Sequence, residues 1–291
     1  MKLTTKKLSI AVLSTALAFG VSTSYTKEHA GAAIDKNRIV IAGSTALLPL
    51  TNQASKEFKK SNPKIKISVS GSSSIAGPQA VTKGSATIGA CDWDATTEKV
   101  TGLSTFSSLE AHKIAVIPFA AVVSKNNPVD NLSTADLTDI YTGKIKNWKE
   151  VGGPDHTINV YTRSVGSGTR VNFEKKALKG EDIKDSGSNV SKAASSGAMK
   201  TSVAGDNYGI GYIDLAYITP SSGLKALKYN GVAATVANVK AKKYPVWGYG
   251  YLITKKNVSD ANMKFIKFMQ SSKFQNKSLK SLKFIPVKEM K

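Results

Sequence analysis

The chain has 291 residues, enough to bury a sizeable core and to form two lobes. Its 41 lysines and arginines against 20 aspartates and glutamates give a formal net charge of +21, spread along the chain rather than gathered in one tail. The basic residues are not interleaved with aromatic ones, and no zinc-finger, RNA-recognition or homeodomain pattern occurs, which argues against a nucleic-acid partner.

The N-terminal segment has the pattern of a secretion signal. Three lysines within the first seven residues precede an apolar run over residues 8–21 that is too short to span a bilayer, and alanines at positions 30 and 32 fit a cleavage site. We expect residues 1–32 to be a signal peptide and the protein to be secreted or associated with the cell envelope. An uncleaved membrane anchor is the alternative. No cysteine follows the apolar run, so no lipobox acceptor for a lipid is expected.

Strands and helices alternate from residue 38 onward, which is typical of an α/β protein with mainly parallel sheets. The pattern predicts strands over residues 39–42, 65–69 and 86–91, and helices over residues 48–60 and 77–83. The lone Cys91 ends the third strand, where we expect a packed rather than a reactive thiol. A continuous apolar run over residues 115–123 suits a buried strand that passes between lobes.

A second unit follows this strand. The pattern predicts helices over residues 134–141 and 170–178, strands over residues 157–161 and 210–213, and a loop over residues 186–197 that runs into a helix near Met199. A return crossing over residues 244–252 leads to a helix over residues 261–270. We therefore expect lobe 1 to comprise residues 33–121 and 247–291, lobe 2 to comprise residues 122–246, and hinges to lie at residues 122–123 and near residues 246–247.

The strongest candidate for a ligand site is the stretch RSVGSGTR at residues 163–170, between a predicted strand and a predicted helix. Unpaired N–H groups and the macrodipole at a helix N-terminus favour a bound anion. Arg163 also offers paired donors that match two oxygens of one tetrahedral oxyanion. A surface salt bridge of Arg163, and helix-capping roles for Ser167 and Thr169, are the alternatives.

Three other loops repeat this arrangement of a strand, small residues and a helix. They span residues 42–46, 70–77 and 89–92, and each follows the carboxyl end of a predicted strand, where ligands of open α/β sheets bind. One such loop alone is typical of a plain turn. Four of them in one chain predict a shared anion site built from hydroxyls, amides and one fixed positive charge.

As a set, these loops together with TGK at residues 142–144 and NWKEVGG at residues 147–153 resemble the extracytoplasmic phosphate-binding proteins of the phosphate-specific ABC transporter, the PstS family, over residues 38–287. The resemblance implies a two-lobed periplasmic-binding-protein type II fold, in which each lobe is a mixed, mainly parallel sheet flanked by helices and two crossing strands join the lobes. It implies capture of inorganic phosphate between the lobes and delivery to a membrane permease, without a cofactor. The phosphate contacts that it implies are Thr45, Ala46, Ser74, Asp92, Arg163, Ser167, Gly168 and Thr169.

Two features depart from the family pattern. The second loop reads Gly71-Ser72-Ser73-Ser74-Ile75, where members often have G-G-G-S-G, so Ser72 and Ser73 remain alternatives to Ser74 as the contact serine. The second departure is the absence of the lipid-accepting cysteine that would hold the protein near its transporter.

The carboxylate of Asp92 indicates which anion the site prefers. A carboxylate beside an anion is repulsive unless a proton lies between them, and phosphate carries such a proton at neutral pH whereas sulfate does not. An unpaired charged contact costs at least about 1–3 kcal/mol, so Asp92 favours phosphate or arsenate over sulfate or molybdate. A helix N-cap or a partner of Arg163 is the alternative role of Asp92.

No enzyme is expected. The sequence lacks a Ser-His-Asp arrangement, a nucleophile elbow, a phosphate-binding P-loop and a carboxylate–histidine cluster with metal-ligand spacing, so neither catalytic nor metal-binding residues are predicted. The alternative function is a cationic surface or adhesive protein of the cell envelope that binds anionic wall polymers through its lysines. We expect a monomer, because a cleft that opens and shuts works without self-association.

Overall fold

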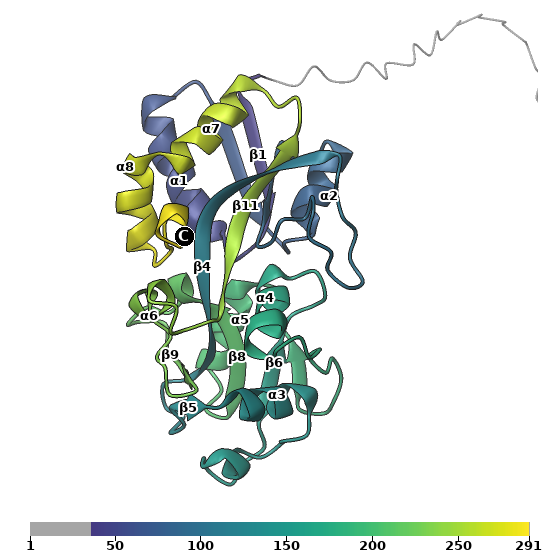
Figure 1. The fold of residues 1–291 in the computed structure, drawn as a ribbon, viewed down its shortest axis with the longest axis vertical. Helices are drawn as coiled ribbons and strands as arrows, with labels where there is room; N and C mark the ends of the chain where they lie inside the picture. The colour runs from purple at the N-terminus through teal and green to yellow at the C-terminus, as the bar shows by residue number, and fades with distance from the viewer. Residues whose placement is uncertain (1–35, 291) are drawn as a thin grey trace, which may run out of the picture. The chain divides into compact units, whose positions relative to one another are not determined.

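The fold is a mixed sheet flanked by helices, seen in a computed structural model that describes residues 36–290 (Figure 1). The predicted signal peptide, residues 1–32, lies outside the described residues. Nine strands form the main sheet, in the order β2-β1-β3-β11-β4-β8-β6-β7 with β9 paired to β4. The strands are β1 (Arg38–Gly43), β2 (Lys66–Gly71), β3 (Ile88–Cys91), β4 (Leu109–Ser124), β6 (Asn159–Thr162), β7 (Val190–Lys192), β8 (Gly209–Asp214), β9 (Leu224–Ala226) and β11 (Trp247–Lys255).

The first half of the sheet contains β1, β2 and β3, which run parallel to one another, and carries α1 (Leu48–Ser61), α2 (Ala76–Lys83) and α7 (Asp260–Gln270). Helix α1 turns Leu50, Ala54 and Phe58 into the core at a spacing of four residues, and its two terminal lysines face solvent. Helix α2 lies unusually close to the sheet because Gly77 has no side chain. A β-carbon at Gly77 would come within 2.8 Å of the Ala90 carbonyl oxygen.

The second half contains the parallel strands β6, β7 and β8, with α3 (Thr134–Thr142), α4 (Gly168–Ala177), α5 (Ser196–Ala204) and α6 (Val236–Lys240). Serines 133, 167 and 195 cap α3, α4 and α5 by accepting from first-turn backbone N–H groups. A separate pair of short strands, β5 (Asn131–Leu132) and β10 (Lys228–Tyr229), lies alongside.

Strands β4 and β11 connect the two halves (Figure 1). Residues Leu109 to Pro118 of β4 pair antiparallel with β11, and Phe119 to Val123 pair antiparallel with β8. The partner of β4 therefore changes between Pro118 and Phe119, three residues before the predicted lobe boundary at residues 121 and 122. On the return path, β11 begins at Trp247, which pairs with Pro118.

Most predicted elements are present within a few residues of their expected bounds, and three differences are instructive. The return crossing starts at Trp247 rather than residue 244, because Pro245 has no N–H to donate to a neighbouring strand. The predicted loop over residues 186–197 contains the short strand β7. Helix α4 starts at Gly168 rather than residue 170, because the Ser167 hydroxyl caps it two residues earlier than expected.

The core is continuous through both halves. Tyr141, Phe173 and Tyr212 pack against one another beside β8, with the rings of Phe173 and Tyr212 stacked 4.5 Å apart. Trp148 is fully buried and its Nε1 donates to the Tyr208 carbonyl at 2.8 Å, so its side chain packs its loop against the core. Cys91 is also fully buried, and burial raises the pKa of its thiol, as expected for a packed thiol.

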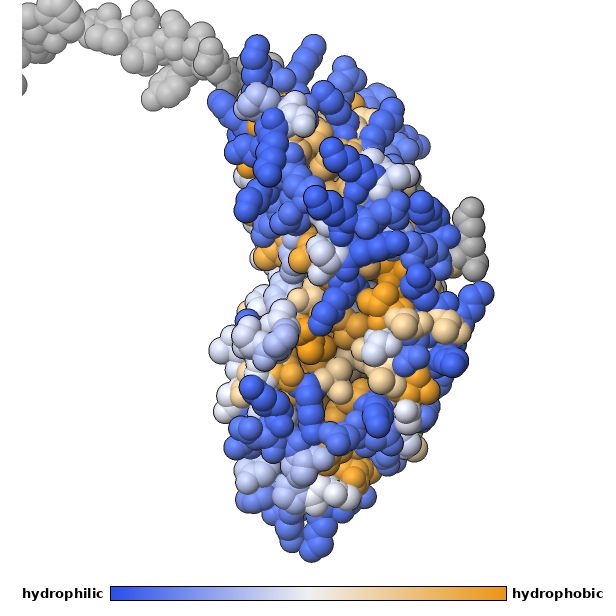
Figure 2. Space-filling model, turned by 90° about the vertical axis from the view of Figure 1, so that its left-hand side faces the viewer, coloured by the Kyte–Doolittle hydropathy of each residue, from blue (hydrophilic) through white to orange (hydrophobic). Residues whose placement is uncertain are grey.

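The surface differs between the two halves on the face shown in Figure 2. Hydrophilic side chains cover the first half on this face. Lysines 56, 60, 273 and 277 line a groove between α1 and the C-terminal helices. Apolar residues are more frequent on the second half of this face. Among the helices between residues 36 and 290, none combines the length and the apolarity that a membrane crossing requires.

Candidate anion-binding site

The four predicted loops meet at the carboxyl ends of β1, β2, β3 and β6. The eight residues predicted from the resemblance are all buried, although they come from both halves of the sheet. They are Thr45 and Ala46 after β1, Ser74 after β2, Asp92 after β3, and Arg163, Ser167, Gly168 and Thr169 after β6. Strands β1, β2 and β3 run toward the second half, whereas β6 and β8 run in the opposite direction, toward the first half, because the two halves pair with opposite ends of β4. The carboxyl ends of both sets of strands therefore meet, which explains why loops distant in sequence converge here.

The Thr45 hydroxyl contacts two residues of the second half, Ser196 and Arg163. Its Oγ1 lies 3.0 Å from the Ser196 hydroxyl, accepts from the Ser196 backbone N–H at 3.1 Å, and accepts from Arg163 Nη2 at 3.4 Å. The Thr45 carbonyl also accepts from the Tyr217 hydroxyl at 2.8 Å. One residue of the first half is thus tied to three elements of the second.

Arg163 directs its guanidinium toward Thr45. Its Nη2 also donates to the Ala194 carbonyl at 3.4 Å, whereas its buried Nε has no hydrogen-bond partner. The side chain is almost completely buried, which contradicts the alternative of a surface salt bridge. Burial lowers the pKa of Arg163, but an arginine stays charged throughout the physiological range. A buried, fixed positive charge therefore faces the loops of the first half.

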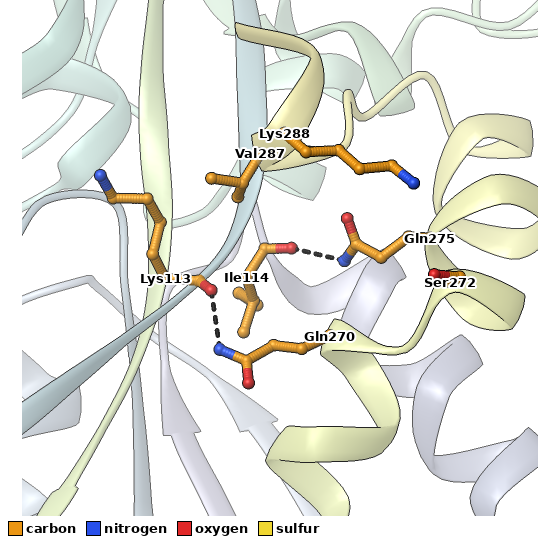
Figure 3. Close-up of a pocket in the computed structure, with 7 residues that line it drawn as sticks. All are labelled: Lys113, Ile114, Gln270, Ser272, Gln275, Val287 and Lys288. Carbon is orange, nitrogen blue, oxygen red and sulfur yellow. Dashed lines mark hydrogen bonds between the residues drawn. The ribbon is translucent and has the colours of Figure 1, made fainter. Parts of the chain in front are cut away.

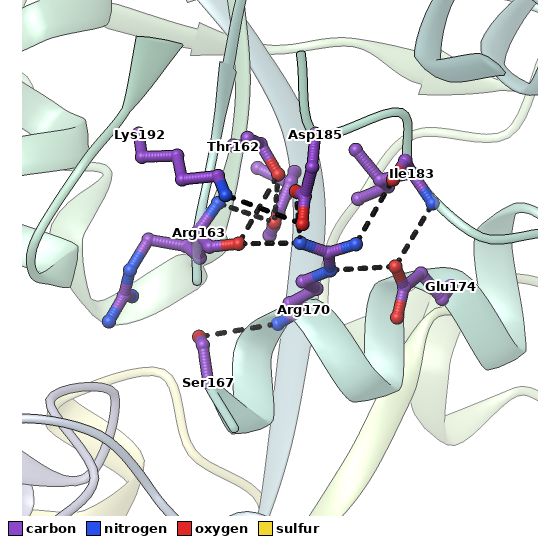
Figure 4. A network of polar contacts seen from close by, with 9 residues as sticks. Thr162, Arg163, Ser167, Arg170, Glu174, Ile183, Asp185 and Lys192 are labelled. Carbon is purple, nitrogen blue, oxygen red and sulfur yellow. Dashed lines mark hydrogen bonds and ion pairs between the residues drawn. The ribbon is translucent and has the colours of Figure 1, made fainter. Parts of the chain in front are cut away.

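Arg170 holds the backbone of Arg163 in place (Figure 4). Its Nη1 donates to the Arg163 carbonyl at 2.9 Å and to Asp185 at 2.5 Å, and its Nε donates to Glu174 at 2.7 Å. Arg163 itself extends away from this network. The two arginines of the motif therefore have different tasks, since one positions the loop and the other reaches into the site.

Helix α4 points its first turn at Asp92. A β-carbon at Gly168 would lie 2.5 Å from Asp92 Oδ2 and 2.3 Å from the Ser74 hydroxyl. The Ser74 hydroxyl accepts from the Asp92 backbone N–H at 3.3 Å, and Asn172 Nδ2 donates to the carbonyls of both Asp92 and Gly168, at 2.8 and 3.0 Å. Only glycine fits at position 168 in this arrangement.

The three serines of the second loop differ in position. Ser72 is exposed and Ser73 is partly buried, whereas Ser74 is buried against Asp92. The geometry thus favours Ser74 over its two alternatives.

Ser167 accepts from the Arg170 backbone N–H at 3.4 Å, so the helix-capping role that the sequence offers as an alternative for Ser167 is present.

The electrostatics of Asp92 suit a proton shared with a ligand. Burial raises the pKa of Asp92 to about 6, while the hydroxyls of Ser44 and Ser74 and the charge of Arg163 act in the opposite direction. One oxygen of this carboxyl group, Oδ1, is buried without a partner. Near neutral pH the carboxylate can therefore accept a hydrogen bond from an acidic hydroxyl.

Three residues that the sequence analysis does not name also belong to the site. Ser44 accepts from the backbone N–H groups of Ala46 and Leu47 at 3.1 and 3.2 Å, and Ser196 joins Thr45. Asp214 ends β8 and is buried. Ser44 lies inside the predicted loop over residues 42–46, whereas nothing in the sequence distinguishes Ser196 or Asp214 from other helix-entry and turn-capping residues.

A different pocket lies beside β4 and lacks these features (Figure 3). Its two glutamines donate to the backbone of that strand, Gln270 to the Lys113 carbonyl at 3.0 Å and Gln275 to the Ile114 carbonyl at 2.8 Å. They secure the C-terminal helices against β4. Between residues 36 and 290, no group of three or more His, Cys, Asp or Glu side chains is arranged to hold a metal ion.

The assembled groups therefore suit an oxyanion that carries a proton. Arg163, several hydroxyls and the N-terminus of α4 supply donors, and Asp92 supplies an acceptor. A fully deprotonated anion would meet the Asp92 carboxylate without a hydrogen between them.

Comparisons with known proteins give a consistent result. Residues 27–273 match the sequence family described as the PBP superfamily domain. The phosphate-binding protein PstS of Bacillus subtilis (strain 168) is 34% identical over 257 residues, which cover 87% of this chain and 82% of the relative. The phosphate-binding protein PstS of Borreliella burgdorferi is 26% identical over 253 residues, with 83% and 88% covered.

Two solved structures resemble the fold over most of its length. A substrate-binding protein assigned to phosphate ABC transport in Clostridium perfringens, solved with bound phosphate, has a TM-score of 0.78 and 32% identity, covering 86% of this chain and 99% of that one. An ABC-type phosphate transport receptor from Vibrio cholerae has a TM-score of 0.65 and 28% identity, covering 85% and 99%.

Proposed function

This chain belongs to the PBP superfamily and, within it, to the PstS-type phosphate-binding proteins, and from this premise we propose that its strand-end loops bind one inorganic phosphate ion. The protein acts as a solute-binding protein that captures phosphate between two lobes and delivers it to the permease of a phosphate ABC transporter. The relatives are named as binding proteins for phosphate, which favours this function over a cationic adhesive protein of the cell envelope. The same names favour binding without catalysis.

The observation that carries this proposal is the meeting of Arg163, Thr45 and Asp92 from different strand ends. The Thr45 hydroxyl lies 3.4 Å from Arg163 Nη2, and Asp92 lies against the first turn of α4 at Gly168. A guanidinium, hydroxyls and a helix N-terminus bind the oxygens of phosphate. The contacts that we assign to the ligand are Thr45, Ala46, Ser74, Asp92, Arg163, Ser167, Gly168 and Thr169.

We further propose that the two lobes comprise residues 33–121 with 247–291, and residues 122–246. Opening would separate Thr45 from Ser196 and Arg163, whose contacts cross between the halves. Strands β4 and β11 are the two connections, so the hinge motion falls on residues 118–123 of β4 and on the start of β11 near Trp247. We propose a monomer, exported by a signal peptide at residues 1–32, and with surface lysines free to meet anionic wall polymers.

The proposal is tested by calorimetric titration of the mature chain, stripped of bound anion, at neutral pH and moderate salt. We expect one-to-one binding of phosphate and no heat from sulfate. A salt series should change the phosphate affinity little, because a buried, hydrogen-bonded site is screened less than surface lysines are. A folded protein that fails to bind phosphate would contradict the proposal, and binding that weakens steeply with salt would favour the cationic surface role.

A further inference from the structure

We propose that Asp214 is a second carboxyl group of the anion site. The phosphate-loaded site then holds two shared protons, one between phosphate and each carboxyl group, whereas a site with Asp92 alone needs only one. This inference rests on the proposed function, because it specifies the protonation state in which phosphate is bound. It makes Asp214 a specificity-determining residue.

The topology brings Asp214 to the same edge of the sheet as Arg163. Strands β6 and β8 are parallel neighbours, and the hydroxyls of Thr162 and Tyr212 lie 3.1 Å apart across them. Arg163 follows directly, and its backbone N–H donates to the same Tyr212 hydroxyl at 2.9 Å. Asp214, two residues after Tyr212, lies on the same face of β8.

A fixed turn connects Asp214 to the loop of the first half. One oxygen of Asp214, Oδ1, accepts from the Ala216 backbone N–H at 3.1 Å and caps the short turn η2 (Leu215–Tyr217). This turn presents the Tyr217 hydroxyl to the Thr45 carbonyl at 2.8 Å. The Asp214 carboxyl group is thus held in one orientation, with its second oxygen free for another partner.

Three buried polar atoms without partners belong to this cluster. Among the described residues, Asp92 Oδ1, Arg163 Nε and Asp214 Oδ2 are buried and make no hydrogen bond. Such atoms are costly unless a ligand satisfies them. The other two unpartnered atoms, the hydroxyls of Ser55 and Tyr141, lie on α1 and α3.

These atoms specify what an occupant must offer. Arg163 Nε can only donate, whereas the two carboxylates can only accept when they are ionised. One anion meets all three if it carries two acidic hydroxyls, as monobasic phosphate does. Dibasic phosphate meets them equally well when one of the two carboxyl groups is protonated. Both descriptions place two protons between the ligand and the two carboxyl groups.

The charged and titratable groups around Asp214 support this count. Asp92 and Arg163 act on it electrostatically, and Tyr217 follows it on η2, while its neighbour on β4 is the apolar Phe119. Burial and the charge of Asp92 raise the pKa of Asp214 well above its ordinary value, and Arg163 only partly opposes them. A second negative charge beside Asp92 and phosphate would be strongly disfavoured.

The consequence is that phosphate binding is coupled to proton uptake. In the free protein, where separation of the lobes lets water reach Asp214, this carboxyl group is ionised above neutral pH, and free phosphate is mainly dibasic. A loaded site with two shared protons must therefore take one up from solution. The dissociation constant should then rise about tenfold for each pH unit. A site that relied on Asp92 alone would bind dibasic phosphate without any such uptake.

The test is calorimetric titration with inorganic phosphate between pH 6 and 8.5, repeated in buffers of different ionisation enthalpy so that protons are counted directly. Wild type should take up about one proton per phosphate at pH 8.5. Asp214→Asn, whose amide still caps η2 and can donate to phosphate, should take up none and should show at least a threefold smaller change in affinity per pH unit. The exposed Asp130→Asn is the matched control and should behave as wild type does.

Identical proton uptake and pH dependence in wild type and Asp214→Asn would overturn the inference. So would tight binding by wild type at pH 8.5 without proton uptake, a result that needs no variant to fold. Neither outcome would affect the proposed function, which fails only if wild type does not bind phosphate.

Discussion

Gly168 and Asp92, which belong to opposite halves of the sheet, are in such close contact that a β-carbon at position 168 would lie 2.5 Å from the Asp92 carboxylate oxygen Oδ2. In the two-lobed motion that we propose, this contact forms only when the lobes close. A single methyl group added at position 168 should therefore hinder closure of the lobes.

Gly168→Ala should therefore weaken phosphate binding by about tenfold or more, because the added methyl group overlaps Asp92 and the Ser74 hydroxyl. Stability should change little, since alanine is the better helix former. Gly197→Ala, in the first turn of α5, is the matched control, because a β-carbon there meets nothing closer than 3.7 Å. Calorimetric titration compares the two variants, and unaltered affinity in Gly168→Ala would show that phosphate binds without this closure.

Asp92→Asn should reduce the preference for phosphate over sulfate by at least about tenfold, because the amide no longer repels an anion without a proton. Sulfate affinity should increase, because the side-chain amide of the variant can donate a hydrogen bond to sulfate, which has no proton of its own to donate. Competition titrations with both anions give the ratio. If selectivity stays unchanged in the folded variant, another group must distinguish the two anions.

Asp92 should also make the unliganded protein less stable as the pH rises. Burial raises the pKa of Asp92 to about 6 from its ordinary value of 3.8, so the folded chain holds this proton more tightly than the unfolded chain does. Between about pH 4 and 6 the wild type should lose up to about 3 kcal/mol of unfolding free energy relative to Asp92→Asn. Urea unfolding of both proteins across this range, without phosphate, measures the difference. A constant difference would mean that Asp92 keeps an ordinary pKa.

Arg163→Lys should weaken phosphate binding by at least about 30-fold, because a lysine ammonium cannot present the planar pair of donors and is more costly to desolvate. The fold should survive, since the guanidinium makes only two hydrogen bonds, both 3.4 Å long. Arg38→Lys, at an exposed arginine on β1, should bind as wild type does. Retained affinity in Arg163→Lys would place the phosphate elsewhere.

Arg170→Met should lower both stability and affinity. Its guanidinium is buried and bonds Glu174, Asp185 and the Arg163 carbonyl, and the loss of a buried charged partner costs about 2–4 kcal/mol. The affinity should fall because the Arg163 loop loses its support. Lys149→Met removes an exposed ion pair with Asp155 and should change neither quantity measurably. A normal affinity in Arg170→Met would show that α4 alone fixes the loop.

The sequence predicts much of this architecture because the signals are local. Apolar runs, helical spacing and small residues at strand ends identify β1, α1 and the loop at Arg163 without any knowledge of the fold. The crossing strands are predicted for the same reason, since residues 115–123 form one uninterrupted apolar run.

What the sequence does not reveal depends on contacts between distant segments. Ser196 is an ordinary helix-entry serine until the fold places it 3.0 Å from Thr45. Asp214 resembles any acidic residue that caps a turn, because its burial beside Arg163 follows from the order of β6 and β8. Short strands such as β7 and β9 are missed because three residues are too few for a periodic pattern.

The position of β11 between β3 and β4 has a consequence for the order of folding. The central part of the second half comes from one uninterrupted segment, whereas the first half needs β1 to β3 from the start of the described chain and β11 from near its end. We therefore expect the middle of the chain to acquire its structure first. Until residues 247–255 have been synthesised, β3 and β4 lack the strand that separates them, and their edges stay open to incorrect pairing.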